Sequence, residues 1–496
     1  MMDLAGITKA GGLTASEVEE LDALLHVYRT TRSRNDAIEA YYEGDVMAKD
    51  IGIDILPPEA RERVHVDLSC DWARKAVKAL ANHVRFDGFV FDGGETDEGL
   101  DRALKRGNFD AEFSRTRVGT LKKGVSFACV NNFGNSAAVT FHSADNGAAL
   151  VNEATGRIRS GFVIADCGRT EWAPRRSVVR QVNLHMTGSR VAIVRDGPST
   201  WHAERVETPP DAMMMVPFVY EPTDKKPLGG TRITKDVRSV IDDVLSVRLA
   251  IAVSRAFYAI PMRAVLGLTE SMYNQLKDKP QWNMYINPFL LATMDKSGHT
   301  PTITQLPSNQ PDALIRLIET DAKLFAAATG VPLQSLGIVQ DNPSSAEAIV
   351  EARRDLIEDA QSFEDEHLIP ALRQIALLVM MVESNKASVD DLDDVQRTVM
   401  PHFKNPAMPS IAATTDAAMK IASVNPAFAS TDVFFEMVGF DQATISRVNS
   451  QMRMNQARAN VSAQPILMNR PATEMPQRTE EPQQPTTTTS GETDED

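Results

Sequence analysis

The sequence predicts an α+β protein that is mainly helical. Apolar residues recur at helical spacing in long stretches before residue 85 and again after residue 231. Between these stretches, residues 125–206 alternate apolar and polar side chains and are interrupted by closely spaced turn sequences. A chain of 496 residues is long enough for several domains. We therefore expect an antiparallel sheet set between two helical regions.

Composition excludes several classes of protein. The formal net charge of −15 argues against tight, non-specific binding to DNA or to an anionic membrane. Cys70, Cys129 and Cys167 are widely spaced without a C-x-x-C motif, which indicates neither a disulfide framework nor a zinc knuckle and fits a reducing cytoplasm. Residues 1–10 lack the pattern of a signal peptide, and no run approaches the roughly 20 apolar residues of a membrane span. We expect no membrane association.

Helices are predicted at the N-terminus. Thr14 and Glu17 form a capping-box sequence that starts a helix running towards Tyr28. A second helical piece is expected to end at Tyr41-Tyr42-Glu43-Gly44, and a third helix to span about Ser69 to Val84.

Repeated turn sequences predict hairpins in the central region. Apolar Val182, Leu184 and Met186 alternate with polar neighbours, which is typical of a half-buried strand. The predicted turns are Asn131-Asn132-Phe133-Gly134, Asp145-Asn146-Gly147, Ala154-Thr155-Gly156, Thr187-Gly188-Ser189 and Asp196-Gly197-Pro198. Met213-Met214-Met215 is compatible with a soft-metal site, but a hydrophobic strand or loop is the favoured interpretation because methionines usually fill gaps in a core.

A long helix is predicted from Thr231 to Pro261, with an apolar stripe along one side. Its other face carries charges of both signs, which an ordinary solvated face would also explain. These residues are Asp236, Arg238, Asp242, Asp243, Arg248 and Arg255. Residues 262–310 form an insertion of mixed character that is rich in turn residues.

The next segment contains two helical patterns separated by a sharp break. A helix is predicted from Pro311 to Thr329, because proline and then an acid suit its first turn and a Gly-Val-Pro sequence follows its end. The polar turn Asp341-Asn342-Pro343 comes next. Ser344 and Glu347 then form a capping box for one long helix that reaches about Val382, with a bend at Pro370.

Acidic clusters and a biased tail complete the chain. Asp390, Asp391, Asp393 and Asp394 predict a solvated surface turn, and we interpret Glu364-Asp365-Glu366-His367 in the same way. A last helical region is expected over residues 409–460. The Pro-, Gln-, Thr- and Glu-rich residues 461–496 predict a disordered tail.

Motifs for catalysis are absent from the sequence. There is no phosphate-binding loop, dinucleotide fingerprint, H-E-x-x-H or G-x-S-x-G, and the nine histidines show no metal-binding spacing. We expect no catalytic residue, no metal site and no cofactor. One alternative stays open, because catalytic groups can assemble from distant positions. A nucleic-acid-processing metalloenzyme would use the helical carboxylates of Asp242, Asp243, Glu347 and Glu351.

The order of these elements resembles the portal proteins of long-tailed, double-stranded DNA bacteriophages. The resemblance covers about residues 15–455. It rests on Tyr41-Tyr42-Glu43-Gly44, on Asp71-Trp72-Ala73-Arg74 with Gly88-Phe89, and on Ala328-Thr329-Gly330-Val331-Pro332 with Asn342-Pro343-Ser344-Ser345-Ala346-Glu347-Ala348. Another phage structural protein, from a baseplate or a minor capsid component, is a further alternative.

The resemblance implies a homo-oligomeric ring, usually of twelve subunits, around a channel for DNA. It implies a wing at 1–230, a stem helix at 231–260, a clip at 261–310, a second stem helix and turn at 311–338, a tunnel loop at 339–345, a long wing helix and return segment at 346–408, a crown at 409–460 and a tail at 461–496.

Partners and site residues follow from the same resemblance. The tunnel loop would place Gln340, Asp341, Asn342, Pro343, Ser344 and Ser345 at the DNA, and the charged face of the stem helix would line the channel. The implied partners are double-stranded DNA, terminase, a head–tail adaptor, and the major capsid and scaffolding proteins. The protein would be a virion component at the portal vertex, assembled in the host cytoplasm. A channel through which DNA moves should not bind the polyanion tightly. An acidic chain and a polar loop without reactive groups fit that requirement.

Overall fold

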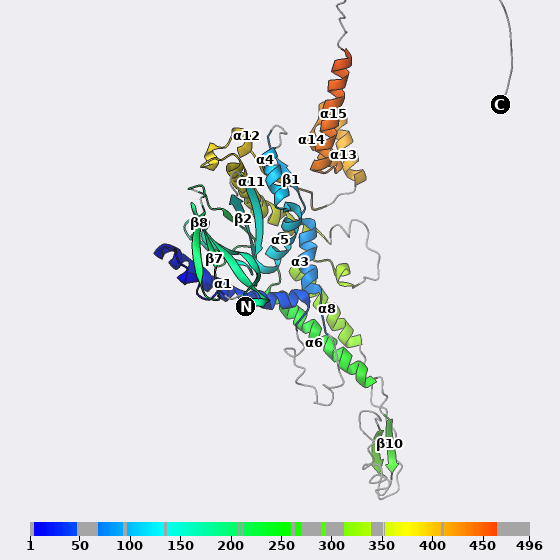
Figure 1. Cartoon of the computed structure of the whole chain (residues 1–496). Coiled ribbons are helices and arrows are strands. Elements are labelled where there is room, and N and C mark those ends of the chain that lie inside the picture. Colours follow the sequence, from blue (N-terminus) through cyan, green and yellow to red (C-terminus); the bar gives the residue numbers. More distant parts are fainter. Residues whose placement is uncertain are drawn as a thin grey trace, which may run out of the picture. The chain divides into compact units, whose positions relative to one another are not determined.

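The computed structural model consists of two units, Met1–Ser410 and Ile411–Asp496 (Figure 1). It describes residues 4–46, 68–92, 97–132, 136–171, 173–206, 208–210, 212–258, 263–268, 289–293, 312–338, 351, 353–407 and 411–463. The predicted tunnel loop, most of the predicted clip and the predicted tail beyond residue 463 lie outside the described residues.

The first long helix, α1 (Ala15–Glu43), begins as the sequence predicts. The Thr14 hydroxyl accepts a hydrogen bond from the Glu17 N–H, and the Glu17 carboxylate accepts one from the Thr14 N–H at 2.7 Å. The expectation of two helical pieces is wrong, because α1 runs unbroken to Gly44. No glycine or proline interrupts residues 28–41, and buried side chains at Asn35 and Ile38 continue the packed face.

Helix α3 (Trp72–His83) confirms the third predicted helix. Two further helices, α4 (Glu98–Arg106) and α5 (Phe109–Lys123), were not predicted. Strand β1 (Phe86–Val90) pairs antiparallel with β12 (Met400–Phe403), which lies more than 300 residues further along the chain. The N-terminal and late parts of this unit therefore fold together.

The predicted sheet region forms two antiparallel sheets rather than one. The three-stranded sheet has the order β3-β2-β9, and the five-stranded sheet has the order β4-β5-β6-β7-β8. The strands are β2 (Val125–Asn132), β3 (Ala137–Ser143), β4 (Gly147–Val151), β5 (Ile158–Thr170), β6 (Ala173–Met186), β7 (Ser189–Arg195), β8 (Trp201–Val206) and β9 (Met215–Val219). The turn Asp145-Asn146-Gly147 connects β3 to β4 and so joins the two sheets rather than closing a hairpin. Strand β2 pairs with β3 on one side and with β9 on the other, which leaves β4 in the other sheet. The predicted turns at 154–156, 187–189 and 196–198 join adjacent antiparallel strands and are confirmed. Phe133 and Gly134 of the first predicted turn lie outside the described residues.

Helices pack against the three-stranded sheet in the largest buried cluster of the described residues. Helices α6 (Lys235–Tyr258) and α8 (Asp312–Thr329) follow the sheets, and a short 3-10 turn, η4 (Leu333–Leu336), follows α8. Between α6 and α8, β10 (Arg263–Leu268) pairs parallel with β11 (Phe289–Thr293). Among the described side chains, one buried cluster joins α3, α5, α6 and α8 to the late helix α11, and another lies between α1 and the five-stranded sheet.

The long late helix is interrupted before the predicted bend. Helix α10 (Arg354–Phe363) passes through a π-helical turn, η5 (Glu364–Leu368), into α11 (Ile369–Glu383). Pro370 has no N–H, and its ring would clash with a carbonyl one turn earlier in a regular α-helix. A wider turn before the proline relieves that conflict. The predicted start of this helix at Ser344 lies outside the described residues.

The first acid of the η5 turn, Glu364, does not lie in solvent as predicted. Glu364 is only 5% exposed, whereas the sequence predicted a solvated charge run. Burial raises the pKa of Glu364 to about 8, and the neighbouring Asp365 adds to that shift, while the Arg85 backbone and Arg117 act in the opposite direction. The wider π turn rotates this position inward, which helical spacing alone does not indicate.

The second acidic cluster is solvent-exposed, as predicted. Its carboxylates cap two short helices, η6 (Val389–Asp391) and α12 (Asp394–Arg397). The Asp391 carboxylate accepts from the Ser388 N–H at 3.1 Å. The cluster is therefore a capped surface turn.

The second unit confirms the predicted last helical region. Its elements are α13 (Ile411–Val424), η7 (Pro426–Ser430), α14 (Asp432–Val438) and α15 (Gln442–Ala463). Thr431 caps α14 by accepting from the Phe434 N–H, and Phe435 stacks on Phe440 with ring centroids 5.9 Å apart. Among the described helices of the chain, none is long and apolar enough to cross a membrane.

Candidate functional site

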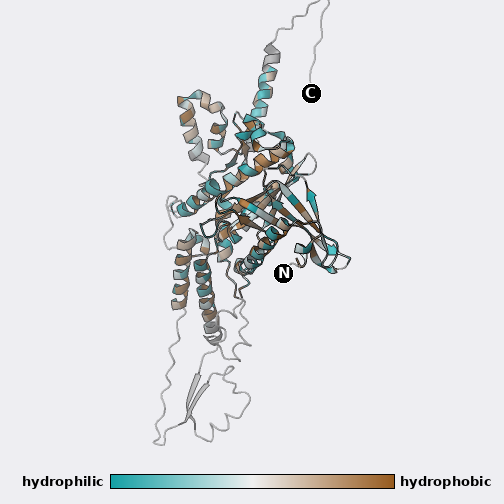
Figure 2. Ribbon diagram, turned by 90° about the vertical axis from the view of Figure 1, so that its left-hand side faces the viewer, coloured by the Kyte–Doolittle hydropathy of each residue, from teal (hydrophilic) through white to brown (hydrophobic). Residues whose placement is uncertain are grey.

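Helices α6 and α8 pack against each other as a pair (Figure 1), and Figure 2 shows hydrophobic and hydrophilic patches along both. Helix α6 buries Val237, Ile241 and Val244, and α8 buries Ala322 and Phe325. The Phe325 ring also lies 5.1 Å from the ring of Trp72 on α3. One face of α8 is therefore buried in the core of its own chain.

A second apolar stripe runs along the exposed part of α8. Leu317 is 50% exposed and Leu324 is 55% exposed, and the two lie seven residues apart. Exposed Ala313, Thr320 and Ala327 complete a spacing of four, three, four and three residues. This spacing gives a continuous seam of the kind that packs against another helix. The described residues of the chain leave this seam uncovered.

The predicted charges of α6 do not share one environment. The Tyr41 hydroxyl donates to both carboxylate oxygens of Asp242 at 2.9 Å, and the Arg238 guanidinium lies 5.8 Å from the Tyr41 ring centroid. Arg248 donates to the backbone carbonyl of Ser69. These three charged side chains therefore contact the N-terminal part of the same chain, at α1 and at the segment before α3.

The other predicted charges lie elsewhere. Asp236 and Asp243 are exposed, and the side chain of Arg255 lies outside the described residues. Burial raises the pKa of Asp321 on α8, and the Asp243 carboxylate adds to the shift. Asp243 is therefore the predicted charge that faces α8. Gln340 to Ser345, the predicted tunnel loop, lies outside the described residues.

A buried arginine that the sequence did not single out joins the helix pair to the rest of the unit. Arg232 precedes α6 and is 5% exposed. Its guanidinium donates to the Ala76 carbonyl at 3.1 Å, the Tyr220 hydroxyl at 2.7 Å, the Thr329 carbonyl at 2.5 Å and the Asp359 carboxylate at 3.1 Å. One side chain therefore connects α3, the end of β9, the end of α8 and α10.

The glycines before Arg232 permit this close packing. Gly229 has φ of +80°, and a Cβ there would lie 2.5 Å from the Tyr220 carbonyl oxygen. In the sequence, the Gly229-Gly230 pair indicates that two backbone segments approach each other closely. It does not indicate that the side chain of Arg232 is buried.

The carboxylates of the metalloenzyme alternative do not converge in the described residues. Asp242 is held by Tyr41, and Glu351 pairs with Arg354 at 3.5 Å. Glu347 lies outside the described residues. Within the described part of the chain, no three His, Cys, Asp or Glu side chains are grouped to hold a metal ion.

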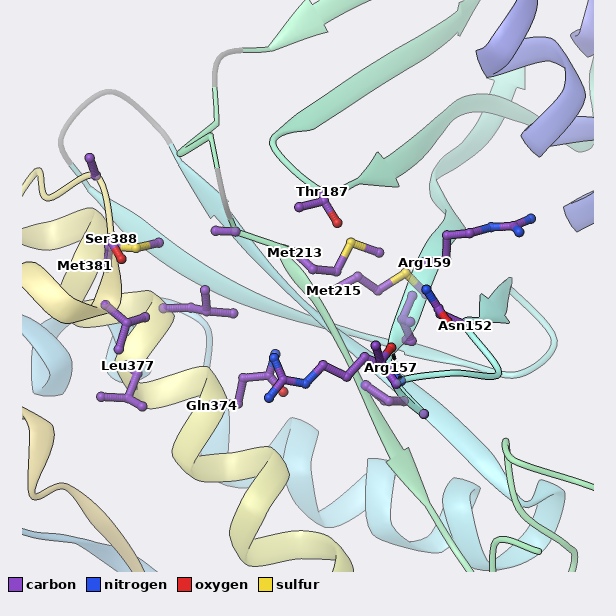
Figure 3. Close-up of a pocket in the computed structure, with 18 residues that line it drawn as sticks. Asn152, Arg157, Arg159, Thr187, Met213, Met215, Gln374, Leu377, Met381 and Ser388 are labelled. Atoms are coloured by element: carbon purple, nitrogen blue, oxygen red, sulfur yellow. Dashed lines mark hydrogen bonds between the residues drawn. The ribbon is translucent and has the colours of Figure 1, made fainter. Parts of the chain in front are cut away.

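A cavity of about 600 Å³ lies between the β4–β5 turn, β9 and α11 (Figure 3). Met213, Met215 and Met381 line it together with Leu377, and Arg157 extends across it in Figure 3. None of the described residues that line this cavity is Asp, Glu, His or Cys. Met214 and Met215 are buried, so the hydrophobic interpretation of the three methionines is confirmed.

The buried His185 and the partly buried His142 predict sensitivity to acid. Burial lowers the pKa of His142 to about 4. Burial, together with the neighbouring Arg190 guanidinium, lowers the pKa of His185 to about 3. Below the ordinary value of 6.5 the unfolded chain binds protons that the folded chain excludes, so stability falls as the pH falls from 6.5 towards 4. The loss is roughly 3 kcal/mol for His142 and roughly 5 kcal/mol for His185 once the pH reaches the folded pKa of each. Thermal unfolding midpoints between pH 4.5 and 8 measure it.

Replacement of His185 by Leu is expected to weaken this pH dependence. Exposed His26, replaced in the same way, is the control and is expected to leave the pH profile unchanged. Parallel pH profiles for the wild type and the His185→Leu variant would contradict the assignment.

Comparisons with known proteins cover most of the chain. Residues 21–427 match the model of a family described as phage portal protein, SPP1 Gp6-like. The portal protein of Mycobacterium phage L5 is 24% identical over 401 residues, which cover 77% of each chain. The portal protein of Mycobacterium phage D29 is 26% identical over 195 residues, which cover 39% of this chain and 38% of the relative.

Two solved structures have weak similarity. A chain in the neck of a native GTA particle, computed with C12 symmetry, matches with a TM-score of 0.36 and 15% identity, covering 80% of this chain and 98% of that one. A chain in the neck of an empty GTA particle, computed with C6 symmetry, matches with a TM-score of 0.35 and 15% identity, covering 78% and 96%.

Proposed function

Because the chain belongs to the family of phage portal proteins of the SPP1 Gp6-like type, we propose that it forms a ring at one capsid vertex through which genomic DNA is packaged and later ejected. The single observation that supports ring formation is the exposed seam on α8. A helix with one face in its own core and a second apolar face in solvent suits lateral packing between identical subunits. Twelve copies is the subunit number that we propose.

In this assignment α6 and α8 are the stem, and residues 261–310, which include β10 and β11, are the clip that meets the head–tail adaptor. Residues 1–230 and 346–408 form the wing, and residues 409–460 form the crown. Terminase binds the assembled ring during packaging, and the major capsid and scaffolding proteins surround it. The protein is then a virion component that acts as a structural conduit rather than as an enzyme.

The stem charges divide into two roles under this proposal. Arg238, Asp242 and Arg248 hold α6 to the wing, since they contact Tyr41 or Ser69. The exposed Asp236 and Asp243, together with Arg255, are the charges that we assign to the channel side. Carboxylates on that side keep DNA from binding tightly, because they offer no counterion release.

Removal of the tunnel loop tests the conduit directly. Deletion of Asp341–Ser344 is expected to leave ring assembly intact and to leave most capsids empty, because this polar turn contributes no predicted core side chain. The measurement is the ratio of DNA-filled to empty capsids, separated by sedimentation, when the variant replaces the wild-type portal in an infection. A length-matched Gly-Ser-Gly-Ser replacement separates loop length from loop identity. Filled capsids at the wild-type ratio in the deletion variant would refute the role of the loop.

A further inference from the structure

The two longest strands, β5 and β6, extend past their neighbours in the five-stranded sheet. Strand β4 pairs with β5 only at residues 158–163, and β7 pairs with β6 only at residues 181–186. Beyond these positions the two strands pair with each other alone, at Cys167 with Val179, Gly168 with Val178 and Thr170 with Ala173. Residues 165–171 and 173–180 therefore form a two-stranded extension, which we name the arginine ribbon.

The ribbon is anchored at its base and exposed near its tip. Val179 is 1% exposed and belongs to the core beneath α1. Residues 174–177, which read Pro-Arg-Arg-Ser, are four consecutive exposed positions. Both faces of the strand are therefore open to solvent at that point.

The charge of the ribbon is opposite to that of the whole protein. Residues 165–180 contain four arginines against two carboxylates and no lysine, whereas the chain has a net charge of −15. Arg180 pairs with Asp166 at 2.6 Å and lies over Gly168, where an added Cβ would be 2.8 Å from its guanidinium carbon. Arg169, Arg175 and Arg176 are exposed and form no ion pair with any described residue. Three guanidinium groups are thus available to an anionic partner.

We propose that the arginine ribbon binds the phosphate backbone of double-stranded DNA, at a contact separate from the predicted tunnel loop. This inference rests on the proposed function, which makes double-stranded DNA the polyanion that the protein handles. Guanidinium groups bind phosphate oxygens in a bidentate manner, and a serine hydroxyl such as that of Ser177 is a further phosphate donor. A two-stranded ribbon also fits the width of a DNA major groove.

The number of free cations sets the strength of the contact. Each phosphate contact contributes about 0.9 to the slope of log affinity against log salt concentration, so three arginines contribute roughly 3. Binding of this kind is non-specific and weak, with dissociation constants of about 10⁻⁴ to 10⁻⁶ M at physiological salt. Identical ribbons repeated around a ring would raise the avidity without a stronger single site.

The test uses the full-length protein and a fluorescein-labelled 30-base-pair duplex of random sequence, followed by fluorescence anisotropy at several salt concentrations. The ribbon variant carries Arg169→Gln, Arg175→Gln and Arg176→Gln. The matched control carries Arg29→Gln, Arg102→Gln and Lys386→Gln, which remove the same charge from exposed positions on other elements. Labelled polyglutamate serves as an acidic polypeptide probe, and thermal unfolding confirms that each variant is folded.

We expect the wild type and the control to bind the duplex alike, and the ribbon variant to lose roughly tenfold or more in affinity at low salt with a slope smaller by about 3. Equal binding by the ribbon variant, absence of duplex binding by the wild type, or preferential binding of polyglutamate would each overturn the assignment. These results do not depend on ring formation, so failure here leaves the portal assignment standing. Failure of the ring is detected separately, by particle mass.

Discussion

Replacement of Leu317 and Leu324 by lysine is expected to abolish ring formation while the chain itself remains folded. Both side chains are about half exposed in the single chain, so their loss removes little from its core. At a subunit interface, burial of each leucine contributes roughly 1.5–3 kcal/mol, and a lysine in the same place adds an unpaired buried charge. The penalty recurs at every interface of a closed ring. Mass photometry is expected to show subunits or small oligomers only.

The control for this variant is Glu319→Lys on the same helix. It changes the net charge by the same amount as the two leucine substitutions, but Glu319 lies outside the exposed seam. We expect the control to assemble normally. Rings of wild-type mass from the double lysine variant, with an unchanged thermal unfolding midpoint in both proteins, would show that the seam is not an interface.

Substitution of Arg232 by Leu is expected to destabilise the first unit more than any other single change discussed. It leaves the Thr329 and Ala76 carbonyls and the Tyr220 hydroxyl without their donor and removes the partner of Asp359. Loss of one partner of a buried charged network costs about 3–5 kcal/mol, and the partial exposure of Asp359 favours the lower end of that range. The thermal unfolding midpoint is expected to fall by at least about 5 °C.

Two further variants make this expectation specific. Arg354→Leu removes an exposed arginine that pairs with Glu351 and Glu358, and it is expected to change stability by less than about 0.5 kcal/mol. Arg232→Lys keeps the charge, but a lysine ammonium lacks the planar set of N–H donors with which the guanidinium reaches four acceptors. The Arg232→Lys variant is therefore expected to be only partly more stable than Arg232→Leu. Unfolding of the Arg232→Leu and Arg354→Leu variants at the same temperature would contradict the stabilising role assigned to Arg232.

Local features of the fold could be predicted from the sequence. The Thr14–Glu17 capping box, the end of α1 at Gly44 and three of the five predicted turns each depend on residues within a few positions of one another. Such interactions are encoded in short stretches, so spacing and residue type suffice to find them.

Features that depend on distant segments could not be predicted. Nothing near Phe86 indicates that its strand pairs with β12, and nothing near Val125 indicates that β9 splits the expected sheet into two. The inward turn of Glu364 depends on a π turn, and the position of Arg232 depends on four segments that meet in the fold. Leu317, Leu324 and Phe325 recur at helical spacing as if on one apolar face, but in the folded chain Phe325 is buried whereas Leu317 and Leu324 are exposed.

The mass of the purified full-length assembly is the most direct test of ring formation. Native mass spectrometry at micromolar subunit concentration measures that mass without assuming a shape. We predict a single closed species whose mass is twelve times the 54.4 kDa mass of one chain. A stable monomer that does not assemble, even with scaffolding and capsid proteins present, would contradict the account.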